Sequence, residues 1–125
     1  MVRAVFGAIL LSLGIVGCSS QPESTQIGGK PLSHWLTALK DKDPKARKAA
    51  VTHVGNVCAS DPSAMSALIE TLKDPDAGVR CEVLLALMRS GSAASEAIPK
   101  IAEMQQKDSN DQVRKYAAKA LERIR

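Results

Sequence analysis

Three related segments in residues 31–125 restrict the fold more than any other feature of the chain. LKDKDPKARKAAVTHVG, LKDPDAGVRCEVLLALM and QKDSNDQVRKYAAKALE begin at residues 39, 72 and 106 and align without gaps. Their arginines, Arg47, Arg80 and Arg114, stand 33 and 34 residues apart, and an aspartate lies six residues before each. A period of this length predicts similar units stacked in a row, each of which buries its apolar side against a neighbour.

Each unit contains the patterns of two helices. Apolar residues recur at i, i+3, i+4 and i+7 in 31–40 and 63–73, and more loosely in 95–105, which predicts a first helix in each unit. A turn rich in Asp, Pro and Asn follows, and Asp43, Asp76 and Asn110 are suitable N-cap residues for second helices over 44–57, 77–90 and 111–124. The sequence therefore predicts an all-α fold of helical hairpins at about 31–57, 62–90 and 95–125.

The pattern D-x-x-V-R-x-x-A-x-x-A-L after an apolar helix resembles HEAT repeats, and most closely their short subclass in phycobilisome-linker lyases. The resemblance covers 31–125 and implies an α-solenoid of about three stacked hairpins. The sequence departs from the family at His53, which replaces the usual Ala, at Ala46, which replaces Val, and at Asn110, which replaces Asp. Trp35 in the first helix is expected to cover the N-terminal end of the stack.

The resemblance also implies that arginines and acidic residues of adjacent repeats form a structural ladder, rather than a catalytic charge array. A planar guanidinium suits bidentate bonding to a carboxylate. Two sets of acceptors remain open for the arginines: the N-cap residues Asp43, Asp76 and Asn110, or the aspartates Asp41, Asp74 and Asp108.

The N-terminus is predicted to be a targeting signal. Arg3 precedes the uncharged, mostly apolar stretch 4–16, which is shorter than the roughly 20 residues of a membrane-spanning helix. Ile15-Val16-Gly17-Cys18 resembles a bacterial lipobox, which implies removal of 1–17 and acylation of Cys18. The alternative is an ordinary signal peptide with an incidental cysteine. Residues 18–30 are expected to be a flexible tether to the cell envelope, with the outer membrane favoured by Ser19 if the source is Gram-negative.

The composition argues against several functions. No hydrolase, nucleotide-binding or metalloprotease motif is present, so we expect no enzyme activity and no cofactor. The net charge of +4 is mild and aromatic residues make up only 2%, which disfavours nucleic-acid binding. A zinc site would require His34, His53, Cys58 and Cys81 to converge from different repeats, so none is expected. Cys58 and Cys81 are expected to be free thiols because the hairpin register separates them.

The remaining candidate site is the outward, concave face of the second helices. Half of its ten members are cationic, and apolar Leu85 and amphipathic Tyr116 are among the others: Lys48, Thr52, Cys81, Glu82, Leu85, Arg89, Lys115, Tyr116, Lys119 and Arg123. This pattern predicts a non-catalytic scaffold that binds a protein or peptide near a membrane. A merely solvated face, a polyanion or envelope-glycan binder, and an accessory part of a lyase-like enzyme remain alternatives.

Overall fold

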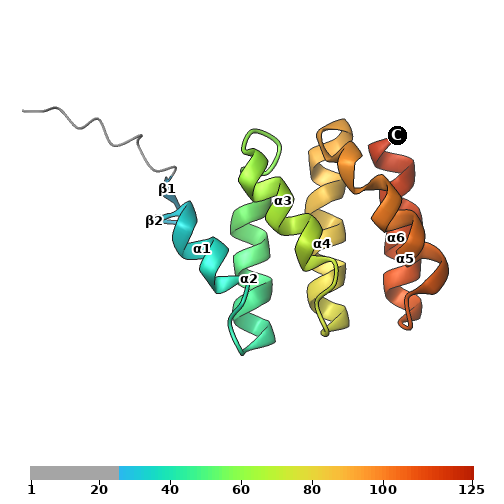
Figure 1. Cartoon of the computed structure of the whole chain (residues 1–125), viewed down its shortest axis with the longest axis horizontal. Coiled ribbons are helices and arrows are strands. Elements are labelled where there is room, and N and C mark those ends of the chain that lie inside the picture. The colour runs from blue at the N-terminus through green and yellow to red at the C-terminus, as the bar shows by residue number, and fades with distance from the viewer. Residues whose placement is uncertain (1–25) are drawn as a thin grey trace, which may run out of the picture.

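The computed structural model describes residues 26–125, which form a row of helical hairpins (Figure 1). The predicted signal segment 1–17, Cys18 and the tether up to residue 25 lie outside the described residues. In chain order, the helices of the hairpins are α1 (Leu32–Ala38), α2 (Pro44–Gly55), α3 (Pro62–Thr71), α4 (Ala77–Ser90), α5 (Ile98–Lys107) and α6 (Asp111–Ile124). The all-α solenoid predicted from the repeats is confirmed, and no helix within 26–125 is long and apolar enough to cross a membrane.

The predicted caps begin the second helices. The side chain of Asp43 accepts a hydrogen bond from the Lys45 amide, and Asp76 accepts one from Val79. Asn110 accepts the equivalent bond from Val113 at the start of α6. Because each cap satisfies an amide that the first helical turn leaves unpaired, these three residues fix where the second helices start.

The connection between α4 and α5 is longer than the other turns. Gly91 ends α4 with a φ of 55°, and the 3₁₀ segment η1 (Gly91–Ala97) leads into α5. Pro99 lies in the first turn of α5, where its missing amide removes no intrahelical hydrogen bond. The first helix of the third hairpin therefore begins at Ile98, three residues later than the start of the predicted segment.

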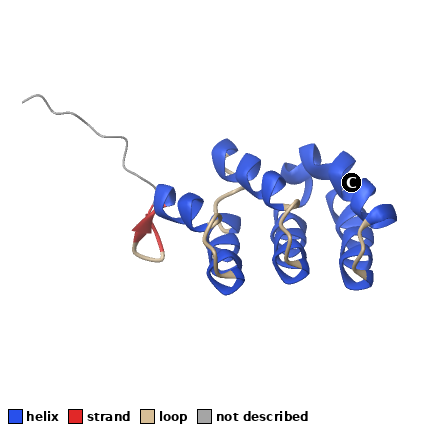
Figure 2. Ribbon diagram, turned by 60° about the horizontal axis from the view of Figure 1, so that its bottom comes forward, coloured by secondary structure: helices blue, strands red, loops and turns tan. Residues whose placement is uncertain are grey.

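The second helices form the inner layer of the stack. α2 packs closely on α4, and α4 on α6, whereas α1 and α3 touch only at a few residues (Figures 1 and 2). The core between the layers is continuous and includes the fully buried Val51, Leu68, Leu84, Leu87 and Ile101. Since the second helices approach more closely than the first, they lie on the inner side of any curvature of the stack.

The prediction of a flexible tether over 18–30 is wrong for residues 26–30, which are folded. Strands β1 (Gln26–Ile27) and β2 (Lys30–Pro31) pair antiparallel in a small hairpin that packs on the N-terminal end of the solenoid. Gly28 and Gly29 form its two-residue turn with φ values of 57° and 76°, the backbone that tight hairpins require. Ile27 is buried, so residues 26–31 belong to the folded unit.

Trp35 and His53 hold this hairpin in place. The indole N–H of Trp35 donates to the carbonyl of Ile27 at 2.7 Å, and its ring stacks on His53 with centroids 3.8 Å apart. His53 occupies the register position of Ala86 in α4, where a small side chain packs against Gly55 of the preceding hairpin. Within the described residues no helical hairpin precedes that of α1 and α2, and the imidazole of His53 fills the corresponding space beside Trp35. The departure of His53 from the family pattern is therefore part of an N-terminal cap.

Candidate functional site

The arginine–aspartate ladder joins neighbouring hairpins at the corner between their first and second helices. Arg47 donates from Nε to Asp74 Oδ2 at 2.8 Å and from Nη2 to Asp74 Oδ1 at 3.0 Å. Its Nη1 donates to the backbone carbonyls of Asp41 and Lys42 in its own corner. The side chains of Arg47 and Asp74 are only 12% and 7% exposed, so the pair is largely shielded from solvent.

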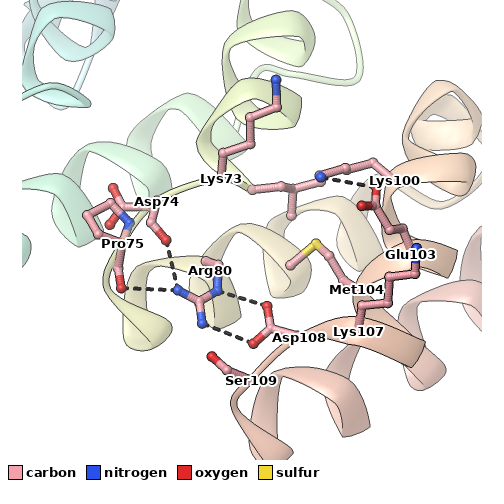
Figure 3. Close-up of a pocket in the computed structure, with 11 residues that line it drawn as sticks. Lys73, Asp74, Pro75, Arg80, Lys100, Glu103, Met104, Lys107, Asp108 and Ser109 are labelled. Atoms are coloured by element: carbon pink, nitrogen blue, oxygen red, sulfur yellow. Dashed lines mark hydrogen bonds and ion pairs between the residues drawn. The ribbon is translucent and has the colours of Figure 1, made fainter.

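We call each arginine–aspartate pair a rung of the ladder. The second rung, between Arg80 and Asp108, repeats the geometry of the first one hairpin further along (Figure 3). Arg80 donates from Nε and Nη2 to the two oxygens of Asp108, each at 3.0 Å, while its Nη1 donates to the carbonyls of Asp74 and Pro75. Each arginine is thus fixed by its own corner and bonds the aspartate of the next one. This bidentate arrangement sets the register between hairpins.

The ladder uses only one of the two predicted acceptor sets. Asp74 and Asp108 bind arginines, whereas the assignment of Asp43, Asp76 and Asn110 to the ladder is wrong. The reason is local, because those three side chains accept hydrogen bonds from the amides of their own helices. Asp74 and Asp108 each also accept the backbone amide two residues later, which aims the carboxylate at the preceding hairpin.

The rungs shift the ionisation of their members. The hydrogen bond from Arg47 to Asp74 raises the pKa of Arg47 above its ordinary value. Burial is the largest single influence on Asp108 and disfavours its charged form. The hydrogen bonds from Arg80 and the Asn110 amide, with the charges of Arg80 and Arg114, outweigh burial, so the pKa of Asp108 lies below its ordinary value. These shifts have a structural origin and do not indicate an acid–base catalyst.

The outward face of α4 carries an apolar strip, which we define as Cys81, Leu85 and Met88. These residues follow the spacing i, i+4, i+7 and are all half-buried. The opposite side of α4 supplies the core through Val79, Val83 and Leu87. Cys81 and Met88 also pack against this core from its edge, whereas Leu85 is not among the residues packed against it. Sequence reasoning identified Leu85 but missed Met88, although the same helical spacing could have found it.

Polar residues of the predicted face flank the apolar strip on the adjacent helices. On α2, Lys48 is exposed and Thr52 donates to Glu82 of α4 at 3.2 Å. On α6, Tyr116 is half-buried with the Lys119 ammonium 5.8 Å from its ring centroid. The other cationic members are exposed at the same outward positions: Arg89, Lys115 and Arg123. The structure thus places the predicted residues along the three second helices, with the apolar part in the middle.

The cysteines and histidines occupy separate places. Cys58 is a buried free thiol whose Sγ lies 2.9 Å from Ser90 Oγ, and Cys81 is a half-buried free thiol on the apolar strip. Burial raises the pKa of the Cys81 thiol, which opposes thiolate formation and nucleophilic reactivity. His34 and His53 both lie against Trp35 in the N-terminal cap.

Two hollows lie between the widely spaced first helices. A cavity of about 390 Å³ beside the second rung is lined by Lys73, Lys100 and Lys107 around Met104 (Figure 3). A second cavity, of about 490 Å³, lies between α1 and α3 and is lined by Leu36, Leu39 and Ala67 with charged residues at its edge. In the first cavity, Arg80 bonds Asp108 and Lys100 pairs with Glu103, so several of its charges are already neutralised within the protein.

Comparison with known families agrees with this architecture. The family model of HEAT repeats matches residues 32–122, which covers all three hairpins. No curated protein matches the chain.

Proposed function

We propose that this chain, which belongs to the HEAT-repeat family, is a non-catalytic scaffold. It binds a protein or peptide on the face formed by α2, α4 and α6. Acylated Cys18 tethers it to a bacterial envelope membrane. HEAT repeats generally serve as protein-interaction scaffolds and are usually non-catalytic. The family supports the scaffold role in general, whereas the binding face and the membrane anchor are proposed for this chain in particular.

The observation that carries the proposed binding face is the apolar strip. Because Cys81 and Met88 also contribute to the core, the part of the strip that remains for a partner is the half-buried side chain of Leu85. An apolar side chain at the middle of a face favours an interaction site. Leu85 and Met88 are half-buried on α4, between the polar outward sides of α2 and α6. A partner side chain placed over α4 would be shielded from water by α2 on one side and α6 on the other.

The charges beside the strip favour an acidic partner. Lys115, Lys119 and Arg123 lie on α6, and Arg89 lies at the C-terminal end of α4. Glu82 is half-buried on α4, and Thr52 donates a hydrogen bond to it. A segment with an apolar residue over Leu85 and carboxylates toward α6 matches this distribution.

The proposed anchor would hold the solenoid close to the membrane. Only residues 19–25 separate Cys18 from the first described strand, because 26–31 belong to the folded unit. Seven residues extend to at most about 25 Å. Metabolic labelling with an alkynyl fatty acid tests the anchor: the wild type should be labelled and recovered with membranes, and Cys18→Ala should lose both. Labelling that is unchanged in Cys18→Ala would exclude Cys18 as the acylation site.

The binding face is tested by capture from an envelope extract with the full chain. Leu85→Asp should remove specific partners, because it places a charge in the apolar strip. Leu36→Asp is the matched control, since Leu36 is also half-buried but lies on α1 at the cavity between the first helices. Partners that are lost from Leu85→Asp and retained by Leu36→Asp support the proposal. The same partner set on all three proteins would refute it.

A polyanion is the second candidate partner, because Lys48, Arg89, Lys115, Lys119 and Arg123 make half of the predicted face cationic. Binding to a polyanion releases counterions and falls steeply with salt, whereas an interface over Leu85 depends weakly on it. Heparin affinity in 50 and 300 mM NaCl, compared between the wild type and Leu85→Asp, separates the two. Strong, salt-sensitive binding unaffected by Leu85→Asp would favour the polyanion.

A further inference from the structure

The ladder leaves an arginine without its usual partner at the C-terminal end. Arg114 holds the same backbone anchor as the other two arginines, with Nη1 donating to the Asp108 carbonyl at 2.7 Å. Within residues 26–125 no aspartate of a following corner reaches it, and its Nη2 instead contacts Asp111 at 3.1 Å. The Arg114 side chain is 37% exposed, compared with 12% for Arg47 and Arg80.

The N-terminal end presents the matching carboxylate. Asp41 accepts the amide of Asp43 at 2.9 Å, the same turn that orients Asp74 and Asp108 in the two complete rungs. Asp41 is exposed, and no arginine side chain of the described residues bonds its carboxylate. One preorganised donor and one preorganised acceptor therefore remain at opposite ends of the same molecule.

The neighbouring residues extend this complementarity. At the first interface, Arg47 is followed by Lys48, and the facing corner contains Asp74 and Asp76. A Cβ built on Gly78 would lie 3.7 Å from Lys48 Nζ and 3.0 Å from Asp76 Oδ1, so the ammonium and the carboxylate approach across that glycine.

The two ends repeat these residue types. Arg114 is followed by Lys115, and the first corner contains Asp41 and Asp43. The second interface lacks both this lysine and this second aspartate, because Cys81 follows Arg80 and Asn110 replaces the aspartate. The ends therefore resemble the first interface more closely than the second interface does.

We propose that copies of this chain associate head to tail, with Arg114 of one copy binding Asp41 of the next and Lys115 facing Asp43. The contact continues the repeat register from one molecule into another. It is confined to the corner, because the strand hairpin, Trp35 and His53 cover the rest of the N-terminal end. Such a contact does not close on itself unless its rotation forms a ring, so it generates short rows of molecules.

The charges near the contact predict a weak association that depends on the rung. Exposed Lys40, Lys42 and Lys45 flank Asp41 in the sequence and repel Arg114 and Lys115, whose charges Asp111 partly offsets through contacts of 3.1 and 3.0 Å. Loss of the Arg114–Asp41 pair should therefore remove the association. An exchange of the two charges should restore it, because the lysines would then attract the new carboxylate at position 114.

The test co-expresses two differently tagged full-length copies, couples contacting amines and carboxylates with a carbodiimide, and recovers one tag under denaturing conditions. Wild-type copies should give mixed conjugates that contain a Lys115–Asp43 link. Arg114→Asp alone and Asp41→Arg alone should each reduce conjugates at least fivefold. Two tagged copies of the double variant Arg114→Asp/Asp41→Arg should restore them, because every contact then joins the exchanged charges. Arg123→Asp is the matched control, because it makes the same charge change at an exposed site of α6 outside the corner.

Three results would overturn the proposal. They are the absence of mixed wild-type conjugates, failure of the exchanged pair to restore them, and an equal loss in Arg123→Asp. Helix content measured by circular dichroism on each variant identifies any loss that follows from misfolding. Arg114→Gln and Asp41→Asn, which preserve side-chain size, provide a second pair of variants and should also reduce conjugates at least fivefold.

Discussion

The ladder predicts how much free energy of unfolding one rung contributes, and two variants of this chain allow the contribution to be measured. Asp108→Asn removes the negative charge of a rung while the amide oxygen can still accept the Asn110 amide. Asp41→Asn makes the same change in the same turn, but within the described chain no arginine bonds the Asp41 carboxylate, and Arg47 donates only to its backbone carbonyl. The difference between the free energies of unfolding of the two variants therefore gives the contribution of the rung without that of the turn.

The expected magnitude follows from the geometry of the second rung. Arg80 makes two hydrogen bonds of 3.0 Å to Asp108, and the two side chains are 12% and 9% exposed. A hydrogen bond to a charged group contributes about 1.5–3 kcal/mol, and a neutral one about 0.5–1.5 kcal/mol. Asp108→Asn should therefore lower the free energy of unfolding by about 2 kcal/mol. Asp41→Asn should change it by less than about 0.5 kcal/mol, as exposed substitutions usually do.

The measurement is urea unfolding followed by helical circular dichroism at micromolar concentration, at several pH values. The pKa of Asp108 is lowered by folding, so its contribution is complete above its unfolded pKa near 4 and is lost as pH falls through the folded value. The stability gap between the wild type and Asp108→Asn should be constant from pH 7 to 5 and should narrow below pH 4. Equal losses in Asp41→Asn and Asp108→Asn, or a gap unchanged at pH 2.5, would refute this account.

Two further substitutions test the cap and the inter-repeat core. Gly28→Ala should detach the strand hairpin and shift Trp35 emission to the red, because its Cβ would lie 2.7 Å from His53 Cε1. Gly29→Ala has the same positive-φ strain but no atom within 4 Å of its Cβ, so it is the matched control and should shift the emission less. Leu84→Ala should cost about 3 kcal/mol in urea unfolding, because Leu84 is fully buried between hairpins, and a loss below about 1 kcal/mol would contradict that packing.

The helical hairpins could be predicted because several local signals agree in each unit. Apolar spacing, an N-cap residue and a proline or glycine at the boundary all point to the same helix ends at Asp76 and Gly91. The choice of ladder acceptor could not be made from spacing alone. Asp74 and Asp76 lie in the same corner, and only the backbone decides which one faces its own helix and which faces the preceding hairpin.

The N-terminal cap escaped prediction for a different reason. A strand of two residues has no measurable alternation, and its polar surroundings resemble a linker. Two signals were nevertheless present: the Gly28-Gly29 pair, which is typical of a tight hairpin turn, and His53 at a position that otherwise holds a small residue. Together with the single Trp35 of the chain, they indicate a cap that only tertiary contact makes visible.

The middle hairpin differs from its neighbours where stacking and binding impose different demands. At the position after the ladder arginine, the first and third hairpins carry lysines and the middle one carries Cys81; four residues later, Leu85 replaces Thr52 and Lys119. These changes replace outward charged and polar side chains with half-buried apolar surface. The register there still rests on fully buried Leu84 and on the bidentate rung from Arg80 to Asp108. Stacking alone gives no reason to place a leucine at an outward position, and the partner proposed for this face would account for Leu85. The middle hairpin is therefore where the effect of mutation on binding should separate most clearly from its effect on stability.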